Sequence, residues 1–156
     1  MNIAVILAGG SGTRMGNDVP KQFLKVAGKK VLEHTIEVFE NAKNIDEICI
    51  VSRTDYINEV ESIIINNGYT KVKKILSGGK ERYDSSLAAI NAYPTNNHNL
   101  LFHDAVRPLL TERIIDDCLT ALNQYNAVDV AIKTTDTIIQ VDNNDCIISI
   151  PNRSEL

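Results

Sequence analysis

The sequence of 156 residues has no tryptophan, and aromatic residues make up only 5% of it. Its three cysteines, Cys49, Cys118 and Cys146, are scattered and form no Cys-x-x-Cys pair. Zinc clusters and a disulfide framework are therefore poorly supported, and reduced thiols fit a cytoplasmic location. The N-terminal apolar run, residues 3–7, has no basic leader and is too short for a signal peptide or a membrane span. We therefore expect no membrane association.

The sequence also lacks an excess of positive charge, since 16 lysines and arginines face 20 acidic residues and the formal net charge is -4. Proteins that grip duplex DNA usually carry a basic face, so this balance argues against a nucleic-acid partner. A nucleotide needs only local positive charge. Five cationic residues lie close together near the N-terminus: Arg14, Lys21, Lys25, Lys29 and Lys30. The length and a hydrophobic content of 44% suit one domain with a real core.

A glycine-rich stretch, LAGGSGTRMG at residues 7–16, follows the first apolar run and is closed by Pro-Lys-Gln at residues 20–22. It lacks the third glycine of the dinucleotide fingerprint and the Lys-Ser/Thr pair of the P-loop. Glycines at the end of a buried strand let backbone N–H groups approach an anion closely. Arg14 and Lys21 add positive charge to the same loop. This pattern predicts a site for nucleotide phosphates, and the alternative is a glycine-rich turn that binds nothing.

Apolar segments and amphipathic segments alternate along the chain. Four helices are predicted, at residues 31–43, from a cap at Thr54 to a stop at Gly68, at residues 82–92, and after a cap at Thr111. Five buried strands are predicted, at residues 3–7, 47–51, 72–76, 100–103 and 127–132. This order predicts an α/β fold with a mostly parallel sheet and helices on both faces.

The pattern changes after Ile132. Two extended pieces flank an Asp-Asn-Asn-Asp turn at residues 142–145, which predicts a projecting β-hairpin arm over residues 134–153. Projecting apolar hairpins seldom stay solvated, so the arm favours a homodimer. No terminal element closes the sheet before Leu156. We therefore expect residues 1–156 to form a single domain that is truncated at its C-terminus.

Two more motifs end predicted strands and so fall on the same sheet edge as the glycine-rich stretch. The first, GGKERYDS at residues 78–85, places Ser85 in the first turn of a helix, where it either meets a ligand or only caps the helix. The second, HDAVRP at residues 103–108, contains Asp104. A carboxylate beside a triphosphate is a usual ligand for Mg²⁺, and the alternative is a structural ion pair with Arg107.

Taken together in this order, the three motifs resemble those of the polyol-phosphate cytidylyltransferases. The first motif is shared by many sugar nucleotidyltransferases, and the match is extended by Asp136-Thr137 and by IPNR at residues 150–153. The resemblance covers the whole chain. It implies a Rossmann-like fold of the nucleotide-diphospho-sugar transferase type. It also implies attack of a polyol phosphate on the α-phosphate of CTP, with release of pyrophosphate.

The resemblance also implies roles for single residues. Arg14 and Lys21 would be catalytic and stabilise the α-phosphate, and Asp104 would hold Mg²⁺. Thr137 and Arg153 would bind the polyol phosphate across a homodimer. The residues expected to hold the nucleotide are Leu7, Ala8, Gly9, Gly10, Gly12, Gly79, Ser85, Ala105 and Arg107.

Two branches of this family compete as the function of the chain. One uses D-ribitol 5-phosphate and makes CDP-ribitol, and the other uses 2-C-methyl-D-erythritol 4-phosphate in isoprenoid synthesis. LAGG at residues 7–10 and IPNR at residues 150–153 resemble the ribitol branch more. A third possibility is a CTP-binding or dimerising module without catalysis.

Overall fold

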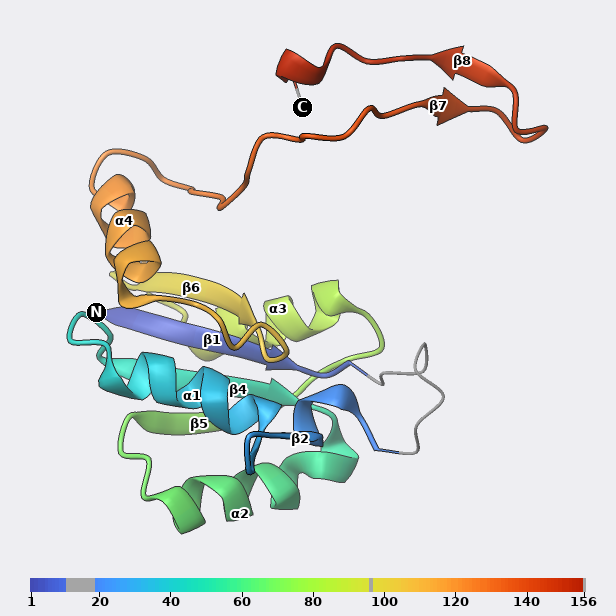
Figure 1. The fold of residues 1–156 in the computed structure, drawn as a ribbon. Coiled ribbons are helices and arrows are strands. Elements are labelled where there is room, and N and C mark those ends of the chain that lie inside the picture. The colour runs from blue at the N-terminus through green and yellow to red at the C-terminus, as the bar shows by residue number, and fades with distance from the viewer. Residues whose placement is uncertain (11–18, 96, 156) are drawn as a thin grey trace.

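The computed structural model describes residues 1–10, 19–95 and 97–155, and Figure 1 shows a parallel sheet with helices packed on it. The sheet has four strands in the order β5-β4-β1-β6, and every neighbouring pair is parallel. The strands are β1 (Asn2–Ala8), β4 (Glu47–Ser52), β5 (Val72–Ser77) and β6 (Asn99–Asp104). The helices are α1 (Val31–Asn41), α2 (Ile57–Asn67), α3 (Arg82–Ala92) and α4 (Glu112–Leu122). The α/β fold class is confirmed.

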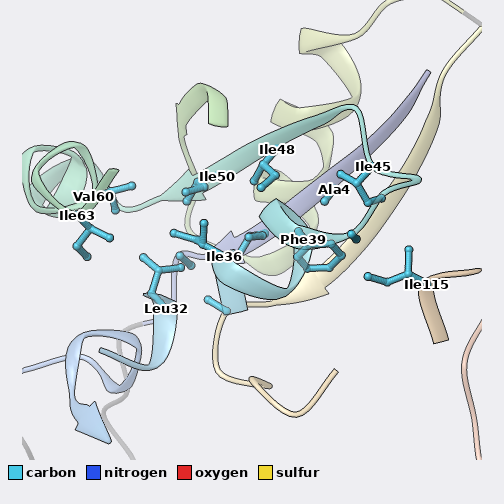
Figure 2. Packing of buried hydrophobic residues seen from close by; sticks show 14 of the residues in the cluster. Ala4, Leu32, Ile36, Phe39, Ile45, Ile48, Ile50, Val60, Ile63 and Ile115 are labelled. Carbon is cyan, nitrogen blue, oxygen red and sulfur yellow. The ribbon is translucent and has the colours of Figure 1, made fainter. Parts of the chain in front are cut away.

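The two faces of the sheet have separate apolar cores because side chains alternate along each strand. Ala4 and Ile6 of β1 point to the face that α1, α2 and α4 cover, where Figure 2 shows the helix side chains closing over the strands. Ile3 and Val5 point to the opposite face, where α3 packs. Helices on both faces were predicted, and they make β1 and β4 buried on both sides.

The predicted ends of α2 are only half right. Gly68 ends the helix in the left-handed conformation (φ 65°), as expected of a glycine at this position. Thr54 does not cap the helix, because residues Thr54–Tyr56 form a short 3-10 helix, η3, that precedes it. The Thr54 hydroxyl instead lies 2.7 Å from the hydroxyl of Ser77, at the end of β5.

Glu40 of α1 forms hydrogen bonds with the segment that precedes β5. Its carboxylate accepts hydrogen bonds from the backbone N–H and the hydroxyl of Thr70 (2.6 and 2.7 Å) and from the backbone N–H of Lys71 (3.0 Å). Burial alone would raise the pKa of Glu40, but these hydrogen bonds outweigh it and hold the pKa below its ordinary value. Loss of the negative charge therefore weakens this connection.

The prediction of a fifth strand at residues 127–132 is wrong, because the backbone of this segment pairs with no strand in the part of the chain that the structure describes. It lies across an apolar groove of about 780 Å³ that is also lined by β6 and α4. A strand needs backbone hydrogen bonds to a neighbouring strand. This segment lies across the groove from β6 and does not pair with it. Ile132 is consequently 92% exposed despite its apolar side chain.

Two small hairpins complete the fold. The predicted arm is present as β7 (Gln140–Val141) and β8 (Ile147–Ser149), which are antiparallel and project away from the sheet in Figure 1. The other hairpin, β2 (Lys25–Val26) and β3 (Lys29–Lys30), was not predicted, and its turn has positive φ at Ala27 and Gly28. Among the described residues, no helix is long and apolar enough to cross a membrane.

Candidate functional site

A cavity of about 600 Å³ opens where the strands of the sheet end. The chain runs from β1 to β4 and β5 on one side, and then returns to β6 on the other side of β1. Loops diverge at such a reversal and leave a crevice at the carboxyl edge. Each of the three sequence motifs contributes to its wall, which consists of Leu7, Ala8, Gly9, Gly10, Gln22, Arg53, Gly79, Lys80, Glu81, Arg82, Ser85, Asp104, Ala105 and Val106.

The glycines of two motifs meet around Ser85, a buried residue in the first turn of α3. A Cβ atom on Gly78 would lie 2.6 Å from Ser85 Oγ, and one on Gly9 would lie 3.4 Å from the same atom. A Cβ atom on Gly79 would lie 2.2 Å from the Cβ of Asp84, which is closer than carbon atoms can approach. Glycine is therefore needed for packing at positions 78 and 79.

Buried side chains hold the backbone that lines the cavity. The Gln22 amide nitrogen donates hydrogen bonds to the carbonyl oxygens of Ala8 (2.7 Å) and Gly10 (3.0 Å). The Thr35 hydroxyl of α1 donates to the carbonyl oxygen of Ala105 (2.8 Å), whose own N–H donates to Leu7 (3.0 Å). The loops after β1 and β6 are thus held in place by hydrogen bonds on the side that faces the protein interior.

Asp104 in the cavity wall forms ion pairs with two arginines. One of its oxygens accepts a hydrogen bond from the Arg82 guanidinium, and the other lies 2.8 Å from Nε of Arg107. The aspartate is mostly buried, but the two arginine side chains are largely exposed. A ring nitrogen of His103 lies 2.9 Å from the Arg107 carbonyl and completes the turn after β6. The predicted ion pair between Asp104 and Arg107 is present.

Asp104 fits a magnesium ion that is shared with a nucleotide. Mg²⁺ is commonly held by one or two carboxylates together with phosphate oxygens and water. Within residues 1–10, 19–95 and 97–155, no cluster of three or more His, Cys, Asp or Glu side chains could hold a metal without such help. A triphosphate in the cavity would offer Arg82 another anionic partner and so free one oxygen of Asp104 for the ion.

The structure brings together most of the predicted nucleotide residues and leaves others apart. Arg107 lines the neighbouring apolar groove instead of the cavity. Lys21 begins the 3-10 helix η2 (Lys21–Phe23), and the next residue, Gln22, lines the cavity. Thr137 and Arg153 lie outside the cavity, in the arm at residues 134–153. Gly12 and Arg14 lie outside the described residues. Those that line the cavity are Leu7, Ala8, Gly9, Gly10, Gly79, Ser85, Asp104 and Ala105.

Arg53 is one of the cations in the cavity wall that the sequence analysis did not identify. It follows β4 directly, lines the cavity, and lies 2.8 Å from Asp55, with its guanidinium 5.8 Å from the ring centre of Tyr56. Its position directly after a buried strand is the same signal that identified Asp104, so the sequence could have predicted Arg53 as a residue of the site. Gln22 and Thr35 gave no such signal, because their contacts depend on the folded backbone.

The model of the 2-C-methyl-D-erythritol 4-phosphate cytidylyltransferase family matches residues 2–156. The chain is 52% identical over 157 residues to the bifunctional ribulose 5-phosphate reductase/CDP-ribitol pyrophosphorylase of Haemophilus influenzae, covering 99% of the chain and 33% of that protein. It is 40% identical over 159 residues to the 2-C-methyl-D-erythritol 4-phosphate cytidylyltransferase of Thermobifida fusca, covering 98% of the chain and 64% of that protein.

A solved structure agrees with these sequence matches. The 4-diphosphocytidyl-2C-methyl-D-erythritol synthase of Anaerococcus prevotii has a TM-score of 0.81 and 31% identity, covering 98% of the chain and 64% of that protein. The chain spans about a third to two thirds of the length of these relatives. Family model, relatives and fold agree with the resemblance that the three motifs carry, and the chain belongs to the 2-C-methyl-D-erythritol 4-phosphate cytidylyltransferase family.

Proposed function

We propose that this chain carries the nucleotide site of a cytidylyltransferase that joins CTP to a polyol phosphate and releases pyrophosphate. The cavity at the carboxyl edge supports this proposal, because it combines glycine backbone from two motifs with Arg53 and Arg82. Exposed backbone N–H groups and guanidinium groups suit a polyphosphate. Ser85 and the turn at Ala105 provide the polar atoms that could recognise the cytidine.

The proposed reaction is an in-line displacement at phosphorus. A phosphate oxygen of the polyol phosphate forms a bond to the α-phosphorus of CTP, and the bond to the bridging oxygen of the β-phosphate breaks. Pyrophosphate leaves with that electron pair, and no covalent intermediate with the protein forms. The work of the protein is then positioning and neutralisation of charge. Lys21 and Arg14 are assigned the stabilisation of the negative α-phosphate.

Asp104 is the proposed ligand of Mg²⁺, together with the phosphates of the nucleotide. When bound, the ion neutralises phosphate charge and favours departure of pyrophosphate. Arg107 keeps the Asp104 carboxylate oriented, and Arg82 turns from the carboxylate to the phosphates. The present ion pairs of Asp104 support these two roles, because each arginine contacts a different carboxylate oxygen.

D-Ribitol 5-phosphate is the proposed acceptor. Two observations favour it, namely the LAGG and IPNR motifs and the 52% identity to a relative whose name includes CDP-ribitol pyrophosphorylase. The alternative acceptor is 2-C-methyl-D-erythritol 4-phosphate, which the family model and the 40% identical relative name. Residues 1–156 alone could also bind CTP without turnover, because the chain spans only 33% and 64% of these two relatives.

The arm is the proposed dimer contact and carries Thr137 and Arg153 to the polyol phosphate of the partner. Its apolar residues support this role, since Ile147, Ile148 and Ile150 are each at least 60% exposed. Sedimentation of the chain should therefore show a dimer, and replacing Ile147 and Ile148 by serine should give a monomer. A monomeric parent chain would remove the basis for binding across subunits.

The function is tested by incubating the chain with CTP and Mg²⁺ and each polyol phosphate in turn, while pyrophosphate release is followed. We expect release with D-ribitol 5-phosphate and a product with the mass of CDP-ribitol. Turnover only with 2-C-methyl-D-erythritol 4-phosphate would assign the other branch, and CTP binding without turnover would favour the non-catalytic module. Lys21→Ala should lower kcat more than CTP affinity, whereas Lys25→Ala in the exposed β2 hairpin serves as the matched control.

A further inference from the structure

Gln22 is a buried polar residue between two parts of the candidate site, and only 3% of its surface is exposed. Its side chain reaches the backbone after β1, at Ala8 and Gly10. Its main chain belongs to η2, the turn that begins with Lys21. Gln22 therefore contacts the backbone at Ala8 and Gly10 and is also the neighbour of Lys21. This backbone and Lys21 are 11 or more positions apart in the sequence.

The direction of these hydrogen bonds is fixed by chemistry. Carbonyl oxygens only accept, so the NH₂ group of Gln22 must face both of them and donates its two hydrogens. A peptide unit is planar and trans, so turning the Ala8 carbonyl toward Gln22 points the Gly9 N–H in the opposite direction. Ala8, Gly9 and Gly10 all line the cavity. Gln22 thereby engages two partially negative oxygens that would otherwise repel a polyphosphate.

The turn that holds Gln22 is itself well anchored. Phe23 is buried and stacks on the ring of Tyr56, with 4.9 Å between ring centres. The Phe23 N–H donates to the Pro20 carbonyl (2.9 Å), and the Leu24 N–H donates to the Lys21 carbonyl (3.1 Å). Lys21 thus sits on a rigid turn whose link to the glycine backbone is Gln22.

We propose that Gln22 is a positioning residue for the nucleotide. It holds the carbonyl groups of Ala8 and Gly10 away from the polyphosphate and sets the place of Lys21 relative to that backbone. This inference rests on the proposed function, because it assumes that the cavity takes a nucleoside triphosphate. It assigns Gln22 an effect on ligand affinity that exceeds any effect on the stability of the fold.

The test compares Gln22→Met, which keeps the side-chain length without donors, and Gln22→Glu, which places a carboxylate against two carbonyl oxygens. The matched controls are Gln124→Met and Gln124→Glu, on the exposed surface after α4. Binding of CTP and of inorganic tripolyphosphate, each with Mg²⁺, is measured by calorimetry on all five proteins. The temperature is kept well below each unfolding midpoint, which circular dichroism determines beforehand.

We expect both Gln22 variants to bind CTP and tripolyphosphate at least tenfold more weakly than the parent, with Gln22→Glu the weaker, and the controls to stay within twofold. If parent and Gln22 variants bind equally while the midpoints fall, Gln22 only supports packing and the inference is overturned. If the parent binds tripolyphosphate but not CTP, the proposed function fails, and the tripolyphosphate ratios still decide the inference. If the parent binds neither, both are wrong. A Gln22 variant that no longer folds would equally make the residue structural and overturn the inference.

Discussion

Replacing Asp104 by asparagine should have opposite effects on CTP binding with and without magnesium. Asp104 occupies Arg82 and Arg107 in the free protein, so the neutral side chain releases two cations into or beside the cavity. Removal of the carboxylate also removes a negative charge from the path of the triphosphate. Both changes favour CTP when no metal is present, although the same substitution deletes the proposed metal ligand.

The magnitude follows from the exposure of the arginines. Two opposite unit charges about 4 Å apart attract by about 4 kcal/mol at an effective dielectric constant of about 20. The arginine side chains are 66% and 73% exposed, so solvent reduces each pair to about 1 kcal/mol at most. Two released pairs give about 2 kcal/mol, which corresponds to about thirtyfold in affinity. Thirtyfold is therefore the upper limit of the gain.

The assay is calorimetric titration of parent and Asp104→Asn with CTP, once in EDTA and once in excess Mg²⁺. We expect tighter binding than the parent in EDTA, and loss of the gain that Mg²⁺ gives the parent. Asp116→Asn on α4 is the control for a general change of charge, since Asp116 contacts Asn44 away from the cavity. Weaker binding by Asp104→Asn in EDTA would refute the reasoning, because it would show that Asp104 mainly supports the loop.

Three further predictions concern the fold around the site. Glu40→Gln should lower the free energy of unfolding by about 1–2 kcal/mol at pH 7. Because the pKa of Glu40 is held below its ordinary value, this difference should shrink as the pH falls below the ordinary glutamate pKa, and it should be lost once the carboxylate is protonated in the folded protein. Urea titrations at several pH values check this. Burial raises the pKa of Cys49 to about 11, so a maleimide at pH 7.5 should label exposed Cys146 first and leave Cys49 unlabelled until the chain unfolds, as peptide mass spectrometry would show. Gly78→Ala should lower both the unfolding midpoint and CTP affinity, because its Cβ would meet the Ser85 hydroxyl, and unchanged values for both would contradict the packing described here.

The centre of the sheet was predictable because β1 and β4 are buried on both faces. Short apolar runs such as residues 3–7 and 48–51 are typical of strands that are buried on both faces of a parallel sheet. Residues 127–132 have the same composition but no strand beside them, and composition alone does not reveal whether a pairing partner is present. The cap predicted at Thr54 is wrong for a similar reason. The Thr54 hydroxyl pairs with the hydroxyl of Ser77 at the end of β5, and the sequence does not reveal that these two residues lie close together.

The candidate site was predictable where side-chain type coincides with the end of a strand, as at Asp104, or with the first turn of the helix that follows a strand, as at Ser85. It was not predictable where a polar side chain acts on a distant carbonyl group. Gln22 and Thr35 bind backbone oxygens, and a backbone oxygen is the same at every position of a sequence. Of the two arginine contacts of Asp104, only the one with Arg107 was predicted, because Arg107 is three residues away whereas Arg82 lies at the start of α3.

The nucleotide cavity and the apolar groove beside β6 share a wall, formed by Arg82, Asp104 and Val106. A small apolar molecule in the groove would therefore change the setting of the Asp104 ion pairs without occupying the place of the nucleotide. Because coupling between two bound ligands is reciprocal, the nucleotide would change the affinity of that molecule by the same factor. A ligand of the groove would thus act on the proposed CTP site without resembling CTP.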